Sequence, residues 1–341
     1  MSKDETKKQI VTVVNQRGNF HDRFARVTVG DVHIARDILE LYADPVISRL
    51  INLDKLQPFT TELISDDLRK ELRMDISFVS QFRDEIGRMG AFFAIEHKSR
   101  PSYYVLLQLA GQAILAIHKM WSLADYTNAK SFKPPVPIMV LLYCGKEDWD
   151  MEELRFQDIF EHIPEELKEF VIQFRVVVVN LKRFHYGKLP GRPETQAAVE
   201  SMKRATDGTF VANLTNIVSP LGKLPMDLRI ESLIKSIISY ASWSEGMTEE
   251  QFNEAIFSIW KGQEGIVMAE TIQKGIVEQC MEKAVARIKI EDILAILEDR
   301  YKQVPSEIRE SLNEMSDPIA LKSLLVHAAS CKSLEDFADS L

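Results

Sequence analysis

The sequence is poor in cysteine and has neither a long hydrophobic run nor an excess of basic residues. Its three cysteines, Cys144, Cys280 and Cys331, lie far apart and lack the spacing of metal ligands, which excludes a disulfide framework or a zinc finger. No stretch reaches the roughly 20 apolar residues that cross a membrane, and the first residues lack the apolar core of a signal peptide. We therefore expect a cytoplasmic protein with reduced thiols and no membrane partner.

Motifs of several common enzyme classes are also missing. The chain has no P-loop, no dinucleotide-binding glycine pattern and no Gly-x-Ser-x-Gly elbow. The formal net charge is −9. Because proteins that bind nucleic acids usually carry a basic surface, this total argues against a nucleic-acid partner. A local basic patch can coexist with an acidic total, and the candidates for one are Lys182, Arg183, Lys188 and Arg192.

Hydrophobic periodicity indicates an α/β domain at residues 18–190, after a flexible N-terminus at residues 1–17. Residues 53–73 have the composition of a polar connection. The order of the predicted elements favours a mixed sheet flanked by helices. These elements are a helix at 31–42, strands at 75–82 and 91–98, a helix at 103–117, a strand at 138–143, a polar helix at 151–170 and a strand at 174–181.

The composition changes at Leu189-Pro-Gly-Arg-Pro193, and residues 191–341 have no strand-like segment. Amphipathic patterns of helical period recur in this part of the chain, at residues 229–243, 264–288, 290–297 and 320–327. Ser333 is expected to cap the last helical turn. We therefore predict that an all-α C-terminal region follows the α/β domain.

Charged residues stand at the ends of two neighbouring predicted strands. Asp75 opens the strand at 75–82, and Glu96 and Lys98 close the strand at 91–98. A short connection would bring these two ends together, and alternate residues of a strand share a face. Two carboxylates and one ammonium group would then converge, and such a group can hold a divalent cation and polarise a water molecule. This is the minimal apparatus of a metal-dependent nuclease.

The chemistry of such a site assigns a role to each residue. Mg²⁺ (or Mn²⁺) prefers oxygen ligands and keeps several waters, so the carboxylates of Asp75 and Glu96 would suffice, with the main-chain carbonyl at His97 as a third ligand. Lys98 would orient the attacking water or neutralise the phosphate. The side chain of His97 should face away from Glu96 and Lys98, so we expect it to pack behind the site.

Five blocks of the sequence together resemble a known family. They are His21-Asp22-Arg23-Phe24, Asp75-Ile-Ser-Phe78, Ile95-Glu-His-Lys-Ser99, Pro134-Pro-Val-Pro-Ile138 and Leu142-Tyr-Cys-Gly-Lys-Glu-Asp-Trp149. They look like the recombination-promoting nucleases, which are often labelled putative transposases and belong to the PD-(D/E)XK nuclease superfamily. The resemblance runs from about residue 20 to the C-terminus, and it implies a restriction-endonuclease-like fold and a bacterial, Mg²⁺-dependent DNA endonuclease that can promote recombination.

The resemblance also assigns roles by position. It makes Asp75 and Glu96 metal ligands and Lys98 the catalytic lysine. Many relatives have Gln where Lys98 stands, so this chain is closer to the pattern of the wider superfamily. In parts of the superfamily an acidic residue from the first helical region joins the metal, which makes Asp22 a candidate. Helix capping explains a lone Asp at this position equally simply.

The helix after the Glu-x-Lys strand carries two glutamines, where relatives often have Arg and Tyr. Gln108 and Gln112 are four residues apart and therefore share one face of the predicted helix. They could contact a substrate phosphate or a water near the metal, and they could equally satisfy backbone groups. We treat both as candidate substrate-binding residues.

Two other classes of function fit the same residues. A Glu-x-Lys preceded by an acidic residue arises by chance in many chains, and an ion pair of Lys98 with Glu96 or Asp75 at the end of a sheet would explain the three charges without a metal. The acidic net charge then favours a catalytically silent protein-interaction module. Cleavage of RNA in place of DNA is a third possibility. Cutting both strands of DNA would require a homodimer, because each chain has one candidate site.

Overall fold

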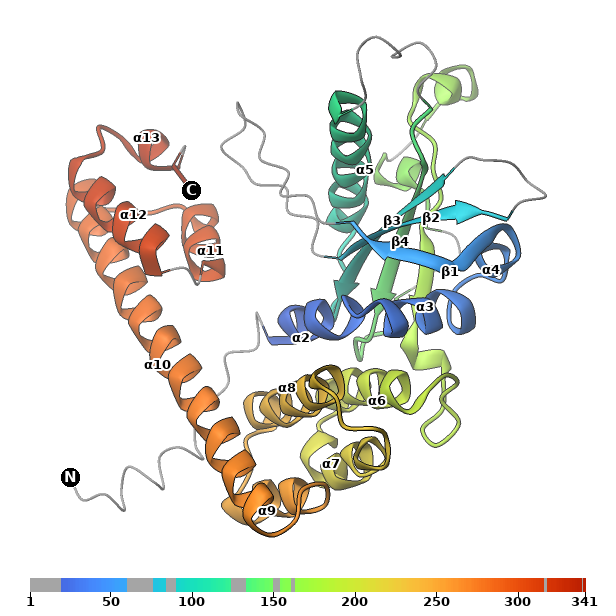
Figure 1. The fold of residues 1–341 in the computed structure, drawn as a ribbon. Helices are drawn as coiled ribbons and strands as arrows, with labels where there is room; N and C mark the ends of the chain where they lie inside the picture. The colour runs from blue at the N-terminus through green and yellow to red at the C-terminus, as the bar shows by residue number, and fades with distance from the viewer. Residues whose placement is uncertain are drawn as a thin grey trace. The chain divides into compact units, whose positions relative to one another are not determined.

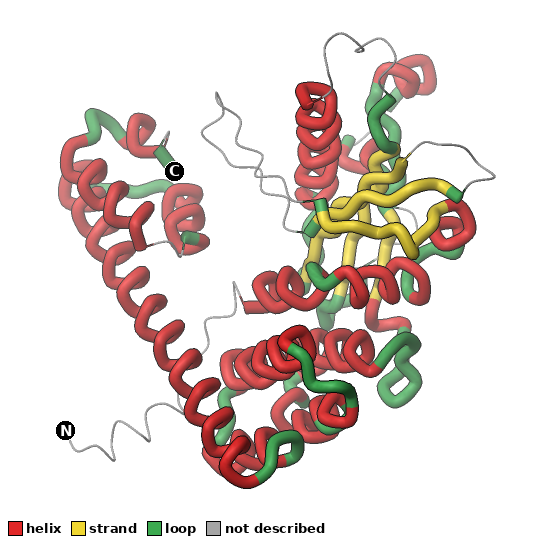
Figure 2. The backbone as a smooth tube through the Cα atoms, in the orientation of Figure 1, coloured by secondary structure: helices red, strands yellow, loops and turns green. Residues whose placement is uncertain are grey.

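Five strands form one mixed sheet in the order β1-β2-β3-β4-β5 (Figures 1 and 2). Antiparallel pairing joins β1 to β2 and β2 to β3, whereas β3, β4 and β5 run parallel. Helices flank the sheet and an all-α region follows it, so the predicted α/β fold class is confirmed. The strands are β1 Ile51–Pro58, β2 Ser77–Phe82, β3 Gly90–Lys98, β4 Val136–Tyr143 and β5 Val177–Asn180.

The computed structural model describes residues 20–59, 76–83, 90–123, 133–149, 154–160, 163–315, 318–338 and 340–341. Two predictions fall outside these residues, namely the flexible N-terminus at 1–17 and the position of Asp75. The described chain divides into two compact units, of which the second begins at Trp260. The first unit therefore contains the sheet and the helices up to Ile259, beyond the domain end predicted at residue 190.

The strands β3 and β4 lie at the centre of the sheet. Residues 91–97 of β3 are all buried, and so are residues 139–143 of β4. Continuous apolar runs of this kind are typical of strands that are covered on both faces. Their parallel register pairs Glu96 with Leu141 and Lys98 with Tyr143, so both strands end at the same edge of the sheet.

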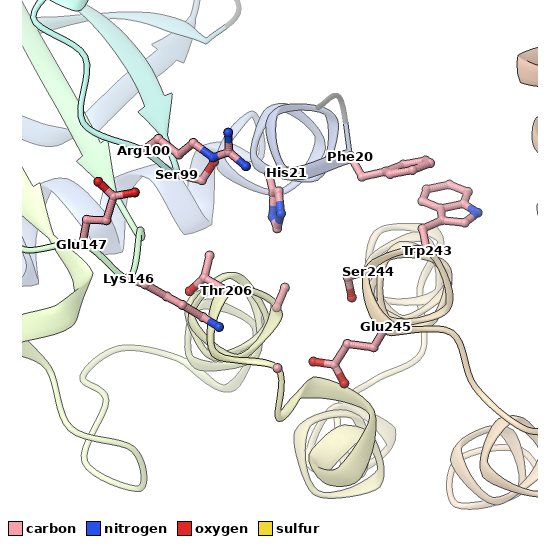
Figure 3. Close-up of a pocket in the computed structure, with 12 residues that line it drawn as sticks. Phe20, His21, Ser99, Arg100, Lys146, Glu147, Thr206, Trp243, Ser244 and Glu245 are labelled. Atoms are coloured by element: carbon pink, nitrogen blue, oxygen red, sulfur yellow. The ribbon is translucent and has the colours of Figure 1, made fainter. Parts of the chain in front are cut away.

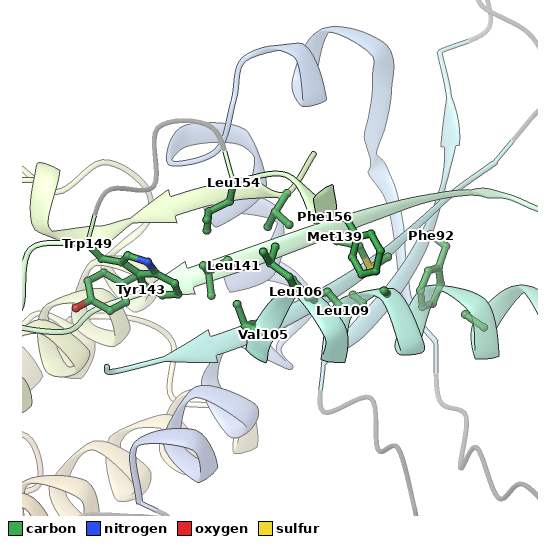
Figure 4. Close-up of a cluster of buried hydrophobic side chains, with 14 residues drawn as sticks. Phe92, Val105, Leu106, Leu109, Met139, Leu141, Tyr143, Trp149, Leu154 and Phe156 are labelled. Carbon is green, nitrogen blue, oxygen red and sulfur yellow. The ribbon is translucent and has the colours of Figure 1, made fainter. Parts of the chain in front are cut away.

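One face of the sheet packs against α5 (Tyr104–Leu123), the helix that connects β3 to β4 (Figure 4). Alternate residues of the two central strands, including Phe92, Ala94, Met139 and Leu141, meet its apolar side. Aromatic rings close the end of this core, where Tyr143 and Trp149 lie edge to face with their centroids 5.4 Å apart. The ring of Trp149 also meets Tyr103, the residue before α5, with centroids 5.9 Å apart, which links the end of β4 to the start of this helix.

The opposite face of the sheet is covered by α2 (Phe20–Val29) and α3 (Val32–Leu41), and α6 (Pro193–Asp207) packs on these two helices (Figure 1). Three further helices, α7 (Phe210–Val218), α8 (Leu228–Glu245) and α9 (Glu249–Phe257), complete the unit. Inside this layer Phe24 and Tyr240 stack with centroids 4.1 Å apart, which joins α2 to α8. The helix α4 (Val46–Leu50) precedes β1.

The second unit is entirely helical in its described residues. It consists of α10 (Gly262–Tyr301), α11 (Ser306–Glu314), α12 (Pro318–Ser330) and α13 (Leu334–Ala338). Its core includes Ile293, Leu297, Leu312, Leu321 and Phe337, all fully buried. None of the helices in the described ranges combines the length and the apolar character needed to cross a bilayer.

Most predicted elements agree with the structure. Ser333 caps the last helix as predicted, because its Oγ accepts a hydrogen bond from the amide of Asp336, and Asp31 caps α3 by accepting hydrogen bonds from the amides of His33 and Ile34. The segments predicted at 264–288 and 290–297 are parts of one helix, α10.

Two predictions are wrong. The connection predicted at 53–73 contains most of strand β1, and the described residues of the polar helix predicted at 151–170 form two short 3₁₀ helices instead. These are η2 (Phe156–Ile159) and η3 (Glu165–Phe170). Two further 3₁₀ turns are η4 (Leu181–Arg183) and η5 (Leu221–Lys223).

Candidate functional site

Glu96 and Lys98 share one face at the end of β3, as the alternation of a strand requires. The Nζ of Lys98 lies 2.9 Å from Oε1 of Glu96. The carboxylate side chain is only 11 % exposed, whereas the lysine side chain is 23 % exposed. A carboxylate taken out of water is costly unless it has a cationic partner or hydrogen bonds. The pair therefore presents a largely desolvated anion at the rim of the sheet, with an ammonium group between it and solvent.

The helix α5 supplies a second contact to the carboxylate. The amide Nε2 of Gln112 donates to Oε2 of Glu96 over 3.3 Å, and Gln112 is buried. One helical turn nearer the start of α5, the Oε1 of Gln108 is buried and has no hydrogen-bond partner among the described residues. Four helical residues span about 6 Å, close to the length of two strand residues, so Gln108 lies level with Lys98. The two predicted glutamines thus face the same strand end.

The side chain of His97 lies on the other face of the sheet, as predicted. Its Nδ1 is 2.9 Å from Oδ1 of Asp22 on α2, and its Nε2 is 3.1 Å from Sγ of Cys144. Burial lowers the pKa of His97, but the neighbouring Cys144 and Asp22 outweigh burial and raise it to about 10. The imidazole ring is therefore a structural link between β3, β4 and α2, and its ring nitrogens are occupied away from Glu96.

Asp22 forms part of this link. Burial raises the pKa of its carboxyl group, but the hydrogen bond and charge of His97 and the charges of Lys98 and His21 lower the pKa below its usual value. Since Asp22 accepts from His97, its carboxylate is directed to the face opposite Glu96. Sequence reasoning recognised Asp22 and His97 separately and missed their contact, which joins residues 75 positions apart.

Asp75 lies outside the described residues. Its sequence neighbour Ile76 is described, and the carbonyl of Ile76 accepts a hydrogen bond from the amide of Ile95 over 2.9 Å. The antiparallel register then pairs Ser77 with Ala94. The start of β2 therefore enters the sheet beside the residue that precedes Glu96, as the hairpin prediction requires.

The donor atoms at this strand end suit a hard cation. One is the carboxylate of Glu96, and a second candidate is the amide oxygen of Gln108, which is buried without a hydrogen-bond partner in the described chain and lies one helical turn from Gln112. Mg²⁺ prefers such oxygen ligands and needs only one or two carboxylates when it retains waters. No group of three or more His, Cys, Asp and Glu side chains suited to a metal comes together within the described ranges. The predicted site is consistent with these atoms and also requires Asp75.

The basic patch suggested by the sequence does not form as a set of free cations. Lys182 Nζ is bonded to Oδ1 of Asp148 and to the carbonyl of Lys146. Arg192 makes a two-pronged contact with the carboxylate of Asp37, at 2.9 and 3.1 Å. Two of the four proposed members therefore have structural roles.

A polar pocket of about 300 Å³ lies at the edge where β3 and β4 end (Figure 3). Sequence reasoning missed it. The signal was available, because residues that directly follow two adjacent parallel strands meet at one edge, where ligands of open α/β sheets commonly bind. The lining residues are Phe20, His21, Ser99, Arg100, Lys146, Glu147, Ala205, Thr206, Gly208, Trp243, Ser244 and Glu245.

Fold and site together define an α/β protein with a carboxylate–lysine pair at the end of a buried strand. The sequence profile of the family described as putative transposase, YhgA-like, matches residues 19–227, which is more than half of the chain and includes the whole sheet. The chain belongs to this family. No curated protein sequence and no solved structure matches it.

Proposed function

We propose that the chain is a Mg²⁺-dependent (or Mn²⁺-dependent) DNA endonuclease of the PD-(D/E)XK type, which hydrolyses phosphodiester bonds and can promote recombination. The observation that carries the proposal is the largely buried carboxylate of Glu96, held 2.9 Å from Lys98 at the end of β3, in a chain of the putative transposase family. A charge is retained in such a position when it has a use or a partner, and here the position matches the resemblance noted in the sequence.

Each residue has a defined role in this proposal. Asp75, Glu96 and the main-chain carbonyl of His97 would hold the ion, and Gln108 would accept a hydrogen bond from a water bound beside it. When bound, the ion stabilises negative charge on the scissile phosphate and lowers the pKa of a water. Lys98 would orient the attacking water or neutralise the phosphate. The lysine ammonium group is a compact charge, so it can do so without bidentate hydrogen bonds.

Gln112 is placed to hold the carboxylate in position. Its hydrogen bond occupies Oε2 of Glu96, while Lys98 occupies Oε1. Each carboxylate oxygen has further lone pairs, so both contacts can persist when a cation binds. A fixed carboxylate orientation is what a site needs for catalysis, because errors of about 1 Å in position can cost a hundredfold in rate.

The proposal is tested by nicking of supercoiled DNA in the presence of Mg²⁺ or Mn²⁺. Glu96→Gln keeps the shape of the side chain and its contact with Gln112 but removes the charge, and Asp75→Asn does the same at the second predicted ligand. Both variants should lose metal-dependent nicking while their melting temperatures stay close to that of the wild type. Equal cleavage by wild type and both variants would remove the proposal. Single-stranded DNA and RNA substrates in the same assay identify the preferred nucleic acid.

A second candidate is a catalytically silent protein-interaction module. Two observations favour it, namely the net charge of −9 and the ion pair that satisfies Glu96 and Lys98 without a metal. Calorimetric titration with Mg²⁺ or Mn²⁺ separates the candidates, since the nuclease predicts binding that Glu96→Gln weakens and the silent module predicts none. The mass of the protein in solution tests the homodimer that cleavage of both strands would require.

A further inference from the structure

We propose that the pocket at the ends of β3 and β4 holds one nucleotide of the substrate DNA strand, next to the scissile phosphate. Arg100 and Lys146 would contact a phosphate, and the rings of Phe20 and Trp243 would contact the base or the sugar (Figure 3). The inference rests on the proposed nuclease function, because it places the pocket beside that active site. It assigns a binding role to residues that the Glu96 site does not use.

The pocket adjoins the candidate site along the chain. Lys98 is the last residue of β3, and Ser99 and Arg100 follow it directly. Arg100 is two residues beyond Lys98, a span of about 7 Å in extended chain. Since Lys98 pairs with Tyr143, the loop after β4 that carries Lys146 begins at the same edge. The lining residues from α2, α6 and α8 stand on the side of the sheet opposite Glu96, so a strand bound at Lys98 would pass over the ends of β3 and β4 to enter the pocket.

The cations of the pocket are available to an anion. Arg100 and Lys146 are exposed, and neither forms an ion pair within the described part of the chain. Of the two acidic lining residues, Glu245 is already engaged, because its carboxylate accepts from the amides of Phe210 and Val211 at 2.8 and 2.9 Å. The carboxylate of Glu147 points away from the ammonium group of Lys146 (Figure 3). Both cations line one pocket and are therefore available to phosphate oxygens of a bound strand.

An aromatic wall completes the pocket. Phe20 from α2 and Trp243 from α8 stack with their centroids 4.8 Å apart and an angle of 24° between the rings. Because the two rings stack on each other, the pair offers a base its outer faces and edges, and a base stacked on such a face contributes about 1–3 kcal/mol whatever its sequence. The volume of about 300 Å³ is at the lower end for small-molecule sites and accommodates one nucleotide, not a duplex.

The loop that carries Lys146 is fixed before any ligand binds. Tyr143 donates from its hydroxyl group to the carbonyl of Glu147 over 2.9 Å, and Thr206 donates to the carbonyl of Cys144 over 2.9 Å. Lys182 donates to the carbonyl of Lys146 over 2.7 Å. A binding loop that is already ordered does not have to lose conformational freedom on binding, which favours affinity.

The test is the binding of a fluorescein-labelled 20-nucleotide single strand, followed by anisotropy in EDTA at several salt concentrations. Without metal the measurement is independent of hydrolysis. Arg100→Ala combined with Lys146→Ala should weaken binding about tenfold and reduce the slope of log K against log salt by about 0.7 for each phosphate that is no longer bound. The control is Arg49→Ala combined with Lys223→Ala, which removes the same charge from exposed positions elsewhere in the unit.

The aromatic wall is tested separately. Trp243→Leu should weaken binding several-fold, whereas Trp243→Phe should retain most of it, because only a ring is needed for stacking. Equal affinities and salt slopes for the wild type, the Arg100/Lys146 variant and its control would overturn the inference. A competition experiment could also overturn the inference. If dAMP displaced the labelled strand at the same concentration as unlabelled strand does, the pocket would be a site for free mononucleotide.

These results are independent of the nuclease test. Glu96→Gln should bind the strand in EDTA at least as tightly as the wild type, because it removes a negative charge beside Lys98 and leaves the pocket residues intact. If Glu96→Gln still cuts DNA, the proposed function fails while the binding data stand. If Glu96→Gln is inactive and the Arg100/Lys146 variant binds normally, the pocket assignment alone fails.

Discussion

Gln112 donates a hydrogen bond from Nε2 to Oε2 of Glu96 over 3.3 Å, and this bond joins the middle of α5 to the end of β3. Both side chains are buried, so the contact is shielded from water. Lys98 holds the other oxygen of the same carboxylate. The orientation of Glu96 is thus set by two neighbours on two different elements, before any cation is present.

The first prediction concerns this bond. Gln112→Ala should lower Mg²⁺ affinity and nicking rate about 10- to 100-fold, which is the usual effect of removing a group that orients a metal ligand. The variant should also lose stability, because a buried carboxylate loses a donor. Gln57→Ala, at an exposed position of β1, is the matched control and should change neither quantity. Wild-type metal affinity in Gln112→Ala would show that the bond does not position the ligand.

The second prediction concerns pH. The pKa of His97 is raised to about 10 in the folded protein, against about 6.5 in an unfolded chain. Between these values the folded state binds the additional proton, so the free energy of unfolding should decrease as pH rises, by at most about 1.4 kcal/mol per pH unit. Below pH 6.5 the contribution of His97 is fully present. Asp22 has a lowered pKa, so its contribution is lost as pH falls below its usual value near 4.

Asp22→Asn tests the origin of the raised pKa of His97. Without the carboxylate the pKa of the imidazole should fall, and the decrease in stability above pH 6.5 should become shallower. Heteronuclear NMR titration of the ring resonances measures the pKa directly, and urea unfolding at several pH values measures the stability. An unchanged pKa for His97 in Asp22→Asn would contradict the assignment of Asp22 as a partner that raises it.

The central elements of the fold were predictable because local sequence and burial agree there. The continuous apolar runs of β3 and β4 indicate strands that are buried on both faces. Because side chains alternate along a strand, Glu96 and Lys98 share one face of β3 and His97 lies on the other. β1 was missed because its pairing with β2 is irregular between Asn52 and Gln57, which breaks the period-two pattern. The helix predicted at 151–170 fails around Pro164, which stands before η3.

Contacts between distant segments were not predictable in the same way. Neither propensity nor spacing reveals that His97 meets Asp22 and Cys144, since α2 must first pack on the sheet. The same limit applies to the basic residues, where Arg192 has a partner only because α3 brings Asp37 to the start of α6. Charge counts in the sequence cannot distinguish a paired cation from a free one.

The third prediction concerns Lys182, whose ammonium group contacts the carbonyl of Lys146 and the carboxylate of Asp148. Lys182→Met should weaken strand binding in EDTA, because the loop that carries Lys146 loses the hydrogen bond that holds it. The slope of log K against log salt should stay that of the wild type. Asp148→Asn removes only the exposed carboxylate and should leave affinity nearly unchanged. A reduced salt slope in Lys182→Met would instead show that Lys182 itself contacts a phosphate.

The last prediction concerns Gly145, where the loop after β4 packs directly against Ser99 in the loop after β3. A Cβ atom at this position would overlap the carbonyl oxygen of Ser99 and the hydroxyl group of Tyr143. Tyr143 is fully buried, so neither neighbour can move easily. Gly145→Ala should therefore destabilise the first unit by about 1–3 kcal/mol, the usual cost of overpacking, and should displace Arg100 enough to weaken strand binding.

Gly275→Ala provides the opposite expectation at a second glycine. Nothing lies within 4 Å of a Cβ atom at Gly275, which is inside the helix α10, so alanine should stabilise this helix by up to about 1 kcal/mol. Thermal unfolding followed by fluorescence compares both variants with the wild type. If Gly145→Ala melts at or above the wild-type temperature, the two loops have room for a side chain, and the pocket between them cannot depend on their close approach.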